Sequence, residues 1–249
     1  MGRGVRIGII GAGHIGALLA RKFSAAGHEV RLANSRGPAS LAQLADEIGV
    51  SAVWLEEVVL GVDALVVSIP EGRIPELPKR LFDNLPLQTA VIDTGNYYPG
   101  LRDPIIDAIE AGLPESQWVS GQIGRPVIKA FNSIIAPSLA EDGRPAGDPA
   151  RIALPVAGDD ADAKRVAIGL VDDAGFDGID AGSLAESWRQ QPGTRAYCTD
   201  LGAEALRHAL AAADREGAPR KRDAAIAKLR QNPSAFAKDD IVRVNRETF

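Results

Sequence analysis

Three glycines near the N-terminus constrain the fold more tightly than any other part of the chain. Gly11, Gly13 and Gly16 have G-x-G-x-x-G spacing and follow a short apolar run at residues 5–10. An apolar pattern with helical period comes next, and then a second apolar segment at residues 29–33. A strand, a glycine-rich turn, a helix and a second strand in this order predict a dinucleotide-binding βαβ unit.

Each glycine has its own role in such a unit. Gly11 permits the tight turn from strand to helix, Gly13 has no side chain to block a pyrophosphate, and Gly16 allows close packing of the helix. The free backbone N–H groups at the start of the helix, together with the helix dipole, favour a bound phosphate. We therefore expect the pyrophosphate of a dinucleotide at this turn.

The end of the second strand indicates which dinucleotide binds. An NAD-binding unit usually has Asp or Glu there to bond the ribose 2′-hydroxyl. This chain has Asn34, Ser35 and Arg36, so no acid repels a 2′-phosphate. Arg36 can pair with that phosphate, Ser35 can donate to it, and Asn34 can line the approach. The alternative is a polar turn with a solvated arginine, and of the two we favour NADP(H).

The composition excludes several classes of function. The net charge is −5, which argues against general attraction to nucleic acid. No apolar run reaches the length of a membrane span, and the first strand begins too near the N-terminus for a signal peptide. Cys198 is the only cysteine, and the three histidines lie outside any cluster with metal-ligand spacing. We expect a cytoplasmic protein with no metal and no membrane partner.

Apolar segments of strand length alternate with helical patterns along the chain, which is typical of a doubly wound, mostly parallel sheet. A Gly- and Pro-rich stretch at residues 141–149 is the best candidate for a boundary. We therefore predict a Rossmann-type α/β fold with an NADP-binding domain at residues 1–140. Residues 150–249 then form a helical C-terminal extension that also adds strands and holds the acceptor or dimer region, and we expect a homodimer.

Some shorter elements are predicted from local signals. Helical patterns cover residues 55–60 and 73–85, and prolines interrupt the second of these early. Thr199 or Asp200 is expected to cap a helix in the C-terminal region.

The loops that follow parallel strands lie at one edge of such a sheet, because the crossover connections are right-handed. Ligands of doubly wound sheets bind at this edge. We therefore expect five loops to converge there, at Gly11, Asn34, Pro70, Thr94 and Asn132.

Three polar residues near this edge have open roles. Asn96 can bond the ribose or the carboxamide of a nicotinamide, and a plain polar turn is the alternative. Asn132 either caps the next helix or contacts a ligand. Lys129 lies within an apolar strand, and we expect its side chain to extend to the sheet edge and solvent, with a role in the site as the alternative.

A loop with the sequence QQPG lies between Trp188 and Arg195. An aromatic face with a cation nearby can stack on a flat, anionic acceptor. The simpler interpretation is a half-buried tryptophan that anchors the loop. The sequence leaves both interpretations open and does not name an acceptor.

Several segments together resemble one known family. In chain order they are GAGHIG, NSRGP, VVSIP, VIKAFNSIIAP, VAGDDADAK and IDAGSLAES, between Ile7 and Ser187. They are similar to the NADP-dependent oxidoreductases of the deazaflavin coenzyme F420, which are related to the NADPH-binding domain of STEAP-type ferric reductases. Asn132 stands where the deazaflavin reductases have histidine, and in this the chain is more similar to the ferric reductases.

The resemblance implies a set of cofactor contacts. The pyrophosphate would lie on the glycine turn, the 2′-phosphate on Ser35 and Arg36, and the nicotinamide beside Ala136. With the residues derived above, the candidate set is Gly11, Ala12, Gly13, His14, Ile15, Gly16, Asn34, Ser35, Arg36, Ile69, Pro70, Asn96 and Ala136.

The activity that the resemblance implies is hydride transfer between NADP(H) and a flavin-like or deazaflavin ring. Such a transfer depends on stacking and alignment more than on a strong acid or base. Two alternatives stay open. One is a hydroxyacid or imino-acid reductase of the 6-phosphogluconate-dehydrogenase-like type, with Lys129 as proton donor. The other is a non-catalytic NADPH sensor whose C-terminal helices bind a protein.

Overall fold

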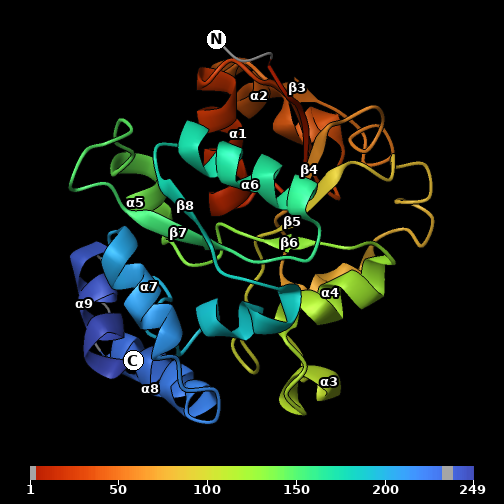
Figure 1. Ribbon diagram of the computed structural model, residues 1–249. Helices are drawn as coiled ribbons and strands as arrows, with labels where there is room; N and C mark the ends of the chain where they lie inside the picture. The colour runs from red at the N-terminus through yellow and green to blue at the C-terminus, as the bar shows by residue number, and fades with distance from the viewer. Residues whose placement is uncertain (1–3, 232–237) are drawn as a thin grey trace.

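The computed structural model describes residues 4–231 and 238–249 (Figure 1). Its centre is a six-stranded sheet in the order β3-β2-β1-β4-β5-β6, in which all neighbouring strands are parallel. The strands are β1 (Arg6–Ile10), β2 (Glu29–Ala33), β3 (Ser51–Ala52), β4 (Ala64–Val67), β5 (Ala90–Asp93) and β6 (Ile128–Lys129). This confirms the predicted Rossmann-type, doubly wound fold.

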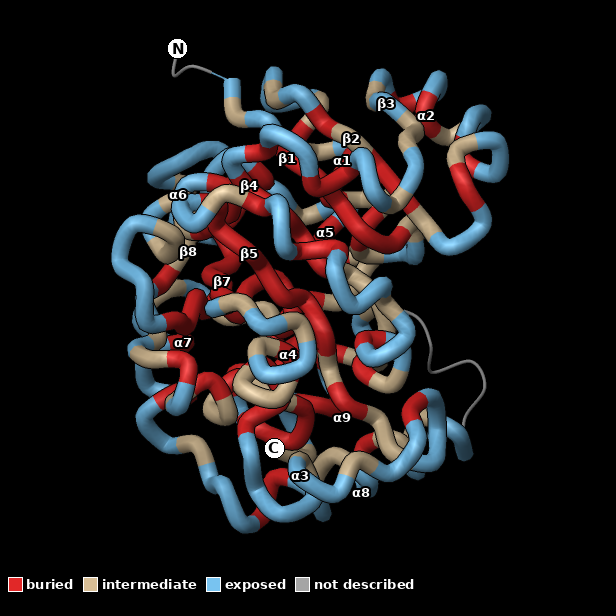
Figure 2. Tube along the Cα trace, turned by 90° about the vertical axis from the view of Figure 1, so that its right-hand side faces the viewer, coloured by how far each residue is buried: buried red, intermediate tan, exposed pale blue. Residues whose placement is uncertain are grey.

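The central strands are apolar on both faces because helices and turns cover both faces of the sheet. All four residues of β4 are buried, and Ile9 of β1 lies beside Leu32 of β2 and Val66 of β4. Figure 2 shows these buried strands at the centre of the molecule, with exposed segments outside them. One face packs against α1 (His14–Ala25), α2 (Ala42–Ile48), α5 (Ala136–Glu141) and α6 (Ala161–Asp173). The other face packs against η2 (Glu71–Glu76), α4 (Glu115–Ile123) and the turns at residues 58–62 and 81–85.

The chain continues past this sheet into a second strand pair. β7 (Ala153–Val156) and β8 (Asp177–Asp180) are parallel, and an antiparallel bridge between Lys129 and Ala157 joins them to the end of β6. The remaining elements are η1 (Pro38–Leu41), α3 (Asp107–Glu110), η3 (Leu184–Gln190), α7 (Ala203–Ala211), α8 (Ala218–Gln231) and α9 (Lys238–Thr248). Figure 1 shows α7, α8 and α9 side by side around the C-terminus. No helix within the described ranges is both long enough and apolar enough to cross a bilayer.

Apolar side chains from both sides of the predicted boundary share one core. Leu154, Leu170 and Phe176 belong to the same buried cluster as Ile9 and Phe23. The predicted stretch at residues 141–149 is largely a loop. A division into domains at 1–140 and 150–249 therefore stays a prediction.

Several local predictions are wrong. Residues 55–60 form turns, and the predicted helix at 73–85 is a short 3-10 helix, η2, followed by turns. Prolines at 75 and 78 supply no N–H group, so a longer helix would lose two donors there. The residue that precedes α7 is Gly202, and neither Thr199 nor Asp200 caps this helix. Asp200 instead accepts a hydrogen bond from Ser138 Oγ at 2.6 Å.

Candidate nucleotide-binding site

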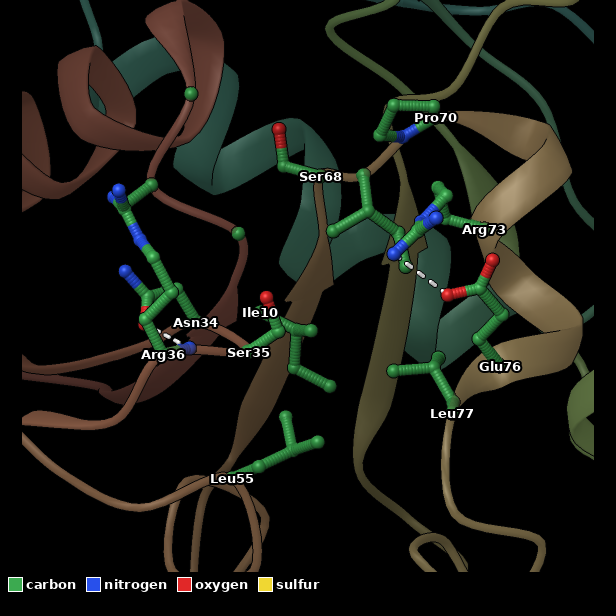
Figure 3. Close-up of a pocket in the computed structure, with 14 residues that line it drawn as sticks. Ile10, Asn34, Ser35, Arg36, Leu55, Ser68, Pro70, Arg73, Glu76 and Leu77 are labelled. Atoms are coloured by element: carbon green, nitrogen blue, oxygen red, sulfur yellow. Dashed lines mark hydrogen bonds and ion pairs between the residues drawn. The ribbon is translucent and has the colours of Figure 1, made fainter. Parts of the chain in front are cut away.

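A pocket of about 530 Å³ opens at the carboxyl ends of β1, β2 and β4 (Figure 3). Its volume is typical of a site for a small molecule or cofactor. The residues that line it are Ile10, Gly11, Ala12, Gly13, Asn34, Ser35, Arg36, Leu55, Ser68, Ile69, Pro70, Arg73, Glu76 and Leu77. Three of the five loops expected to converge thus meet here, those at Gly11, Asn34 and Pro70.

The three glycines of the turn differ in what surrounds them. Gly11 has φ 106°, and a Cβ there would lie 2.2 Å from the carbonyl oxygen of Ser68. A Cβ on Gly16 would lie 2.0 Å from the carbonyl oxygen of Gly11. A Cβ on Gly13 would meet no atom of the described residues within 4 Å. Gly11 and Gly16 are therefore required by packing, whereas Gly13 leaves open space beside the pocket.

The N-terminus of α1 is suited to an anion. Gly13 is its N-cap, no side chain within the described ranges caps the helix, and no acidic residue lies in the first turn. The first backbone N–H groups of a helix lack intrahelical partners, and the helix dipole favours negative charge there. The start of α1 therefore fits the pyrophosphate of a dinucleotide.

The turn after β2 presents a cation to the pocket. Asn34 Oδ1 accepts from the backbone N–H of Arg36 at 2.9 Å, and Asn34 Nδ2 donates to Ser40 Oγ at 3.0 Å. Asn34 thus shapes the turn, and Ser35 and Arg36 are exposed on it. The Arg36 guanidinium makes no ion pair with any residue in the described part of the chain. A free guanidinium beside a serine hydroxyl fits a 2′-phosphate.

The opposite wall carries residues that the sequence analysis missed. Arg73 and Glu76 of η2 form an ion pair of 2.7 Å, and Figure 3 shows them across the pocket from Arg36. Leu55 and Leu77 add apolar surface. A signal for these four residues was present in the sequence. They lie just after Pro70 or in the turn after β3, and loops that follow strands form the ligand-binding edge.

Five predicted residues do not line this pocket: His14, Ile15, Gly16, Asn96 and Ala136. His14 is exposed at the first position of α1, and Ala136 is partly exposed at the first position of α5. Asn96 belongs to a second group of polar residues, which follows β5. The role of all five as cofactor contacts stays a prediction.

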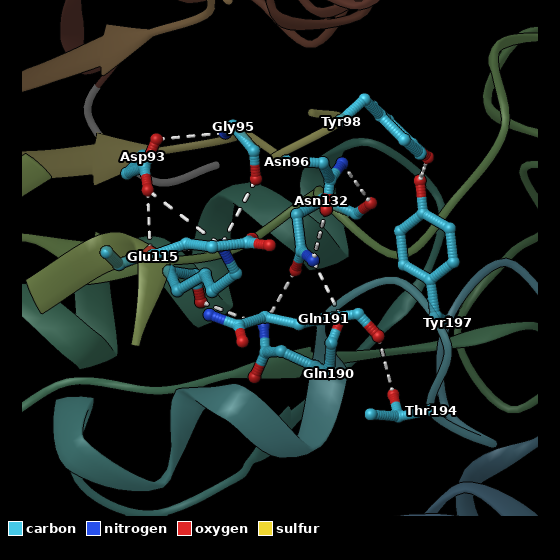
Figure 4. A network of polar contacts seen from close by, with 12 residues as sticks. Asp93, Gly95, Asn96, Tyr98, Glu115, Asn132, Gln190, Gln191, Thr194 and Tyr197 are labelled. Atoms are coloured by element: carbon cyan, nitrogen blue, oxygen red, sulfur yellow. Dashed lines mark hydrogen bonds and ion pairs between the residues drawn. The ribbon is translucent and has the colours of Figure 1, made fainter. Parts of the chain in front are cut away.

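Lys129 is completely buried and does not reach solvent, so the expected side-chain position is wrong. Figure 4 shows three of the residues around it, Asp93, Gly95 and Glu115. Its Nζ donates to Gly95 O at 3.1 Å, to Ser116 Oγ at 3.1 Å and to Glu115 Oε2 at 3.2 Å. Asp93 accepts from Ser116 Oγ at 2.6 Å and from the Gly95 N–H at 2.9 Å. Glu115 and Ser116 begin α4, a helix that was not predicted, and they satisfy the ammonium group inside the protein.

Glu71 adds a third carboxyl group to this buried network. It is 0 % exposed, and neither of its carboxyl oxygens has a hydrogen-bond partner among the described residues. Burial raises its pKa well above the ordinary value, and the charge of Asp93 raises it further. Burial also raises the pKa of Glu115. Burial alone would lower the Lys129 pKa, but Glu115 and Asp93 raise it above its ordinary value. Burial thus favours the uncharged form of Glu71 over the pH range in which an exposed glutamate ionises.

Asn96 and Asn132 bond to each other. Asn96 Nδ2 donates to the Asn132 backbone oxygen at 2.9 Å, and Asn132 Nδ2 donates to Asn96 Oδ1 at 3.0 Å. Asn132 Nδ2 also donates to Gln190 O at 2.7 Å. Both N–H groups of the Asn132 amide are therefore used within the protein, and it neither caps α5 nor remains free to donate to a ligand. The N-cap of α5 is Ile135.

Trp188 and Arg195 do not form a shared site. Trp188 lines a pocket of about 120 Å³ with Tyr97, Arg215 and Arg222, and its ring lies 4.5 Å from Arg189 Cζ. Arg195 lines a different groove, between α7 and α9. Neither residue lines the pocket at the glycine turn. Among the described residues, no group of three or more His, Cys, Asp or Glu is arranged to hold a metal.

A first prediction concerns the free guanidinium. We expect Arg36→Ala to raise the dissociation constant of NADPH by about ten- to a hundredfold, because one charge-assisted contact to phosphate contributes about 1.5–3 kcal/mol. NADH has no 2′-phosphate, so its affinity should change little. Calorimetric titration of both nucleotides measures this. Equal losses for the two would contradict the assignment of Arg36 to the 2′-phosphate.

A matched pair of glycine variants separates binding from folding. Gly13→Val places its side chain in open space, so the protein should melt within about 4 °C of wild type but bind no NADPH. Gly16→Val drives a Cβ into the carbonyl oxygen of Gly11, so it should melt clearly lower. Calorimetry and thermal unfolding report the two properties. Unchanged NADPH affinity in Gly13→Val would place the dinucleotide elsewhere.

A third prediction concerns the buried acid. The pKa of Glu71 is raised in the folded protein. The stability that its proton provides is therefore complete below the pKa of the unfolded state, and it is lost as the pH rises through the pKa of the folded state. Glu71→Gln imitates the protonated acid and cannot ionise. We expect it to melt higher than wild type at about pH 9, with the difference shrinking toward about pH 5.

Glu76→Gln is the control, since that carboxylate is 53 % exposed. It should show no such trend in melting temperature between the same two pH values. A constant difference between Glu71→Gln and wild type across the range would mean that Glu71 ionises normally in the folded protein.

Comparison with known proteins agrees with the geometry. The family described as NADP oxidoreductase, coenzyme F420-dependent, matches residues 6–97. The Escherichia coli K12 protein YjhV is 41% identical over 114 residues, 44% of this chain and 81% of that protein. The solved structure of the hypothetical protein SMa0349 from Sinorhizobium meliloti is 31% identical with a TM-score of 0.67, covering 80% of this chain and 96% of that one.

A more distant structure shares the fold. A candidate F420-dependent NADP reductase from Arthrobacter sp. FB24 is 21% identical with a TM-score of 0.58, covering 74% of this chain and 87% of that one. The glycine turn, the exposed Arg36 and the parallel sheet all lie within the matched range 6–97. Residues 6–97 of the chain therefore belong to the family of NADP oxidoreductases described as coenzyme F420-dependent.

Proposed function

We propose that this oxidoreductase transfers a hydride between NADP(H) and a flat acceptor, a flavin-like or deazaflavin coenzyme. The observation that carries the proposal is the burial of Lys129, whose ammonium group donates to Gly95, Ser116 and Glu115 and is 0% exposed. When bound, NADPH supplies a hydride from its nicotinamide ring. The protein has to bind, orient and shield that ring.

Reduction of a carbonyl or imine benefits from a placed proton donor, which contributes about 10²–10⁴-fold to the rate. Lys129 is the residue that the hydroxyacid-type alternative requires, and it faces only protein groups. Asn96 and Asn132, beside it, are amides and do not titrate. A tricyclic ring spreads the incoming negative charge over its own atoms and takes its proton from water. The described residues near Asn96 therefore suit a flavin-like acceptor better than a keto acid.

Asn96 retains the capacity to hold a carboxamide. Its amide has two N–H groups and two acceptor lone pairs, and Asn132 uses one of each. One donor and one acceptor are left, which is the complement of a primary amide such as that of nicotinamide. Because Asn96 follows β5, this pair lies on the strand next to β4, whose end lines the pocket. The two sites together would hold the two ends of one dinucleotide.

The proposal is tested by a turnover screen. NADPH oxidation is measured with free flavins, a deazaflavin, 2-keto acids and an imine, each at the same concentration. We expect oxidation with a flavin or deazaflavin to be faster than with any keto acid or imine. Arg36→Ala should raise KM for NADPH and leave kcat with the preferred acceptor nearly unchanged.

Two results would overturn the proposal. Turnover of a keto acid or imine but not of flavins, abolished by Lys129→Met in a variant that still folds, would establish the hydroxyacid-type reductase. Tight NADPH binding with no oxidation by any acceptor would instead favour the non-catalytic sensor.

A further inference from the structure

The last residue of η3, Gln190, is completely buried at the junction of the two halves of the chain (Figure 4). Its Nε2 donates to Asn132 Oδ1 at 2.9 Å, to Pro155 O at 3.2 Å and to Lys129 O at 3.4 Å. Its backbone oxygen accepts from Asn132 Nδ2 at 2.7 Å. Gln190 therefore contacts both ends of the Asn132 side-chain amide.

This arrangement fixes the orientation of Asn132. With its oxygen facing the Gln190 amide and its nitrogen facing the Gln190 carbonyl, the Asn132 amide has one favourable orientation. The residue before it, Phe131, has φ 60°, a left-handed conformation that is uncommon for a bulky side chain. Such a conformation persists where the surrounding contacts determine it. The bonds to Gln190 are contacts of that kind.

Asn132 in turn fixes Asn96. The two bonds between them set which side of the Asn96 amide is donor and which is acceptor. The backbone oxygen of Asn96 accepts from Arg102, and the preceding Gly95 is held by Asp93 and Lys129. These contacts place the Asn96 backbone, and the contact with Asn132 orients its side-chain amide. Gln190 therefore acts on Asn96 through Asn132.

We infer that Gln190 is a positioning residue for the nicotinamide end of the cofactor, acting through Asn132 on the amide of Asn96. The inference rests on the proposed function, in which Asn96 holds the carboxamide. Gln190 touches neither the pocket at the glycine turn nor Arg36. Its loss should therefore affect the nicotinamide half of NADPH and spare the adenosine half.

Two ligands separate these halves. NADPH has both, whereas adenosine 2′,5′-bisphosphate has only the adenosine half with its 2′-phosphate. The ratio of their dissociation constants measures how much the nicotinamide half contributes to the affinity for NADPH. Gln190→Met keeps the length of the side chain and removes the amide. We expect this variant to reduce the NADPH advantage over the bisphosphate by about two- to tenfold, the effect of one hydrogen bond, with bisphosphate affinity unchanged.

Gln191→Met is the matched control. Gln191 is the next residue, and its Nε2 has no hydrogen-bond partner in the described part of the chain, so the ratio should stay at the wild-type value. Gln190→Asn, measured in parallel, keeps an amide but is too short to span the same three acceptors, and it should change the ratio in the same direction. If Gln190→Met melts too low for titration, Gln190→Asn takes its place as the test variant.

A third variant tests the route through Asn96. In Asn96→Ala the ratio should already be reduced, and adding Gln190→Met should reduce it no further. An additional loss in the double variant would contradict a route through Asn96. A wild-type ratio in both Gln190 variants would overturn the inference and leave the proposed function intact.

The affinities of the wild-type protein for NADPH and for the bisphosphate test the premises of the inference. Equal affinity for NADPH and the bisphosphate would mean that the nicotinamide is not held at all, which overturns the inference and leaves the adenosine site in place. No affinity for the bisphosphate would overturn the proposed NADP(H) site, and the inference with it.

Discussion

Only a hydrogen atom fits between the first turn of α1 and the loop that precedes it. Gly16 lies against the carbonyl oxygen of Gly11, and Gly11 lies against that of Ser68. These two contacts bring the ends of β1 and β4 and the start of α1 into van der Waals contact. A methyl group at either position would clash with a backbone oxygen, so these elements would have to move apart. The pocket, the position of Arg36 beside it and the uncapped helix start all depend on this close approach.

The loop after β5 is held by polar contacts instead. Both groups of the Gly95 peptide are bonded to buried charged residues, the N–H to Asp93 and the oxygen to Lys129. Burying three carboxyl groups around one ammonium group is costly, and replacing them by apolar side chains often stabilises a protein. The network is therefore better explained by what it fixes than by the stability it adds. It holds one short loop in one conformation, at the edge of the sheet where the proposed chemistry takes place.

Features that depend on neighbours in sequence could be predicted, and features that depend on distant residues could not. The glycine turn and the sequence from Asn34 to Arg36 can each be recognised from a few consecutive residues, and the structure brings them into one pocket. The environment of Lys129 depends on Glu115 of α4, a helix with little apolar periodicity in which only Val119 is a buried apolar residue. Gln190 lies 58 residues from Asn132. No local pattern indicates such a pairing, so this part of the site required the three-dimensional structure.

The single bridge between Lys129 and Ala157 has a consequence for the sheet as a whole. It consists of two hydrogen bonds, Lys129 N–H to Ala157 O at 2.8 Å and Ala157 N–H to Lys129 O at 3.0 Å, and it covers the outer side of β6. The opposite margin of the sheet is β3, which is only two residues long. An uncovered strand several residues long is a template on which another chain can add and aggregate. Within the described residues, the six-stranded sheet ends on one side in a covered strand and on the other in a strand too short to serve as such a template.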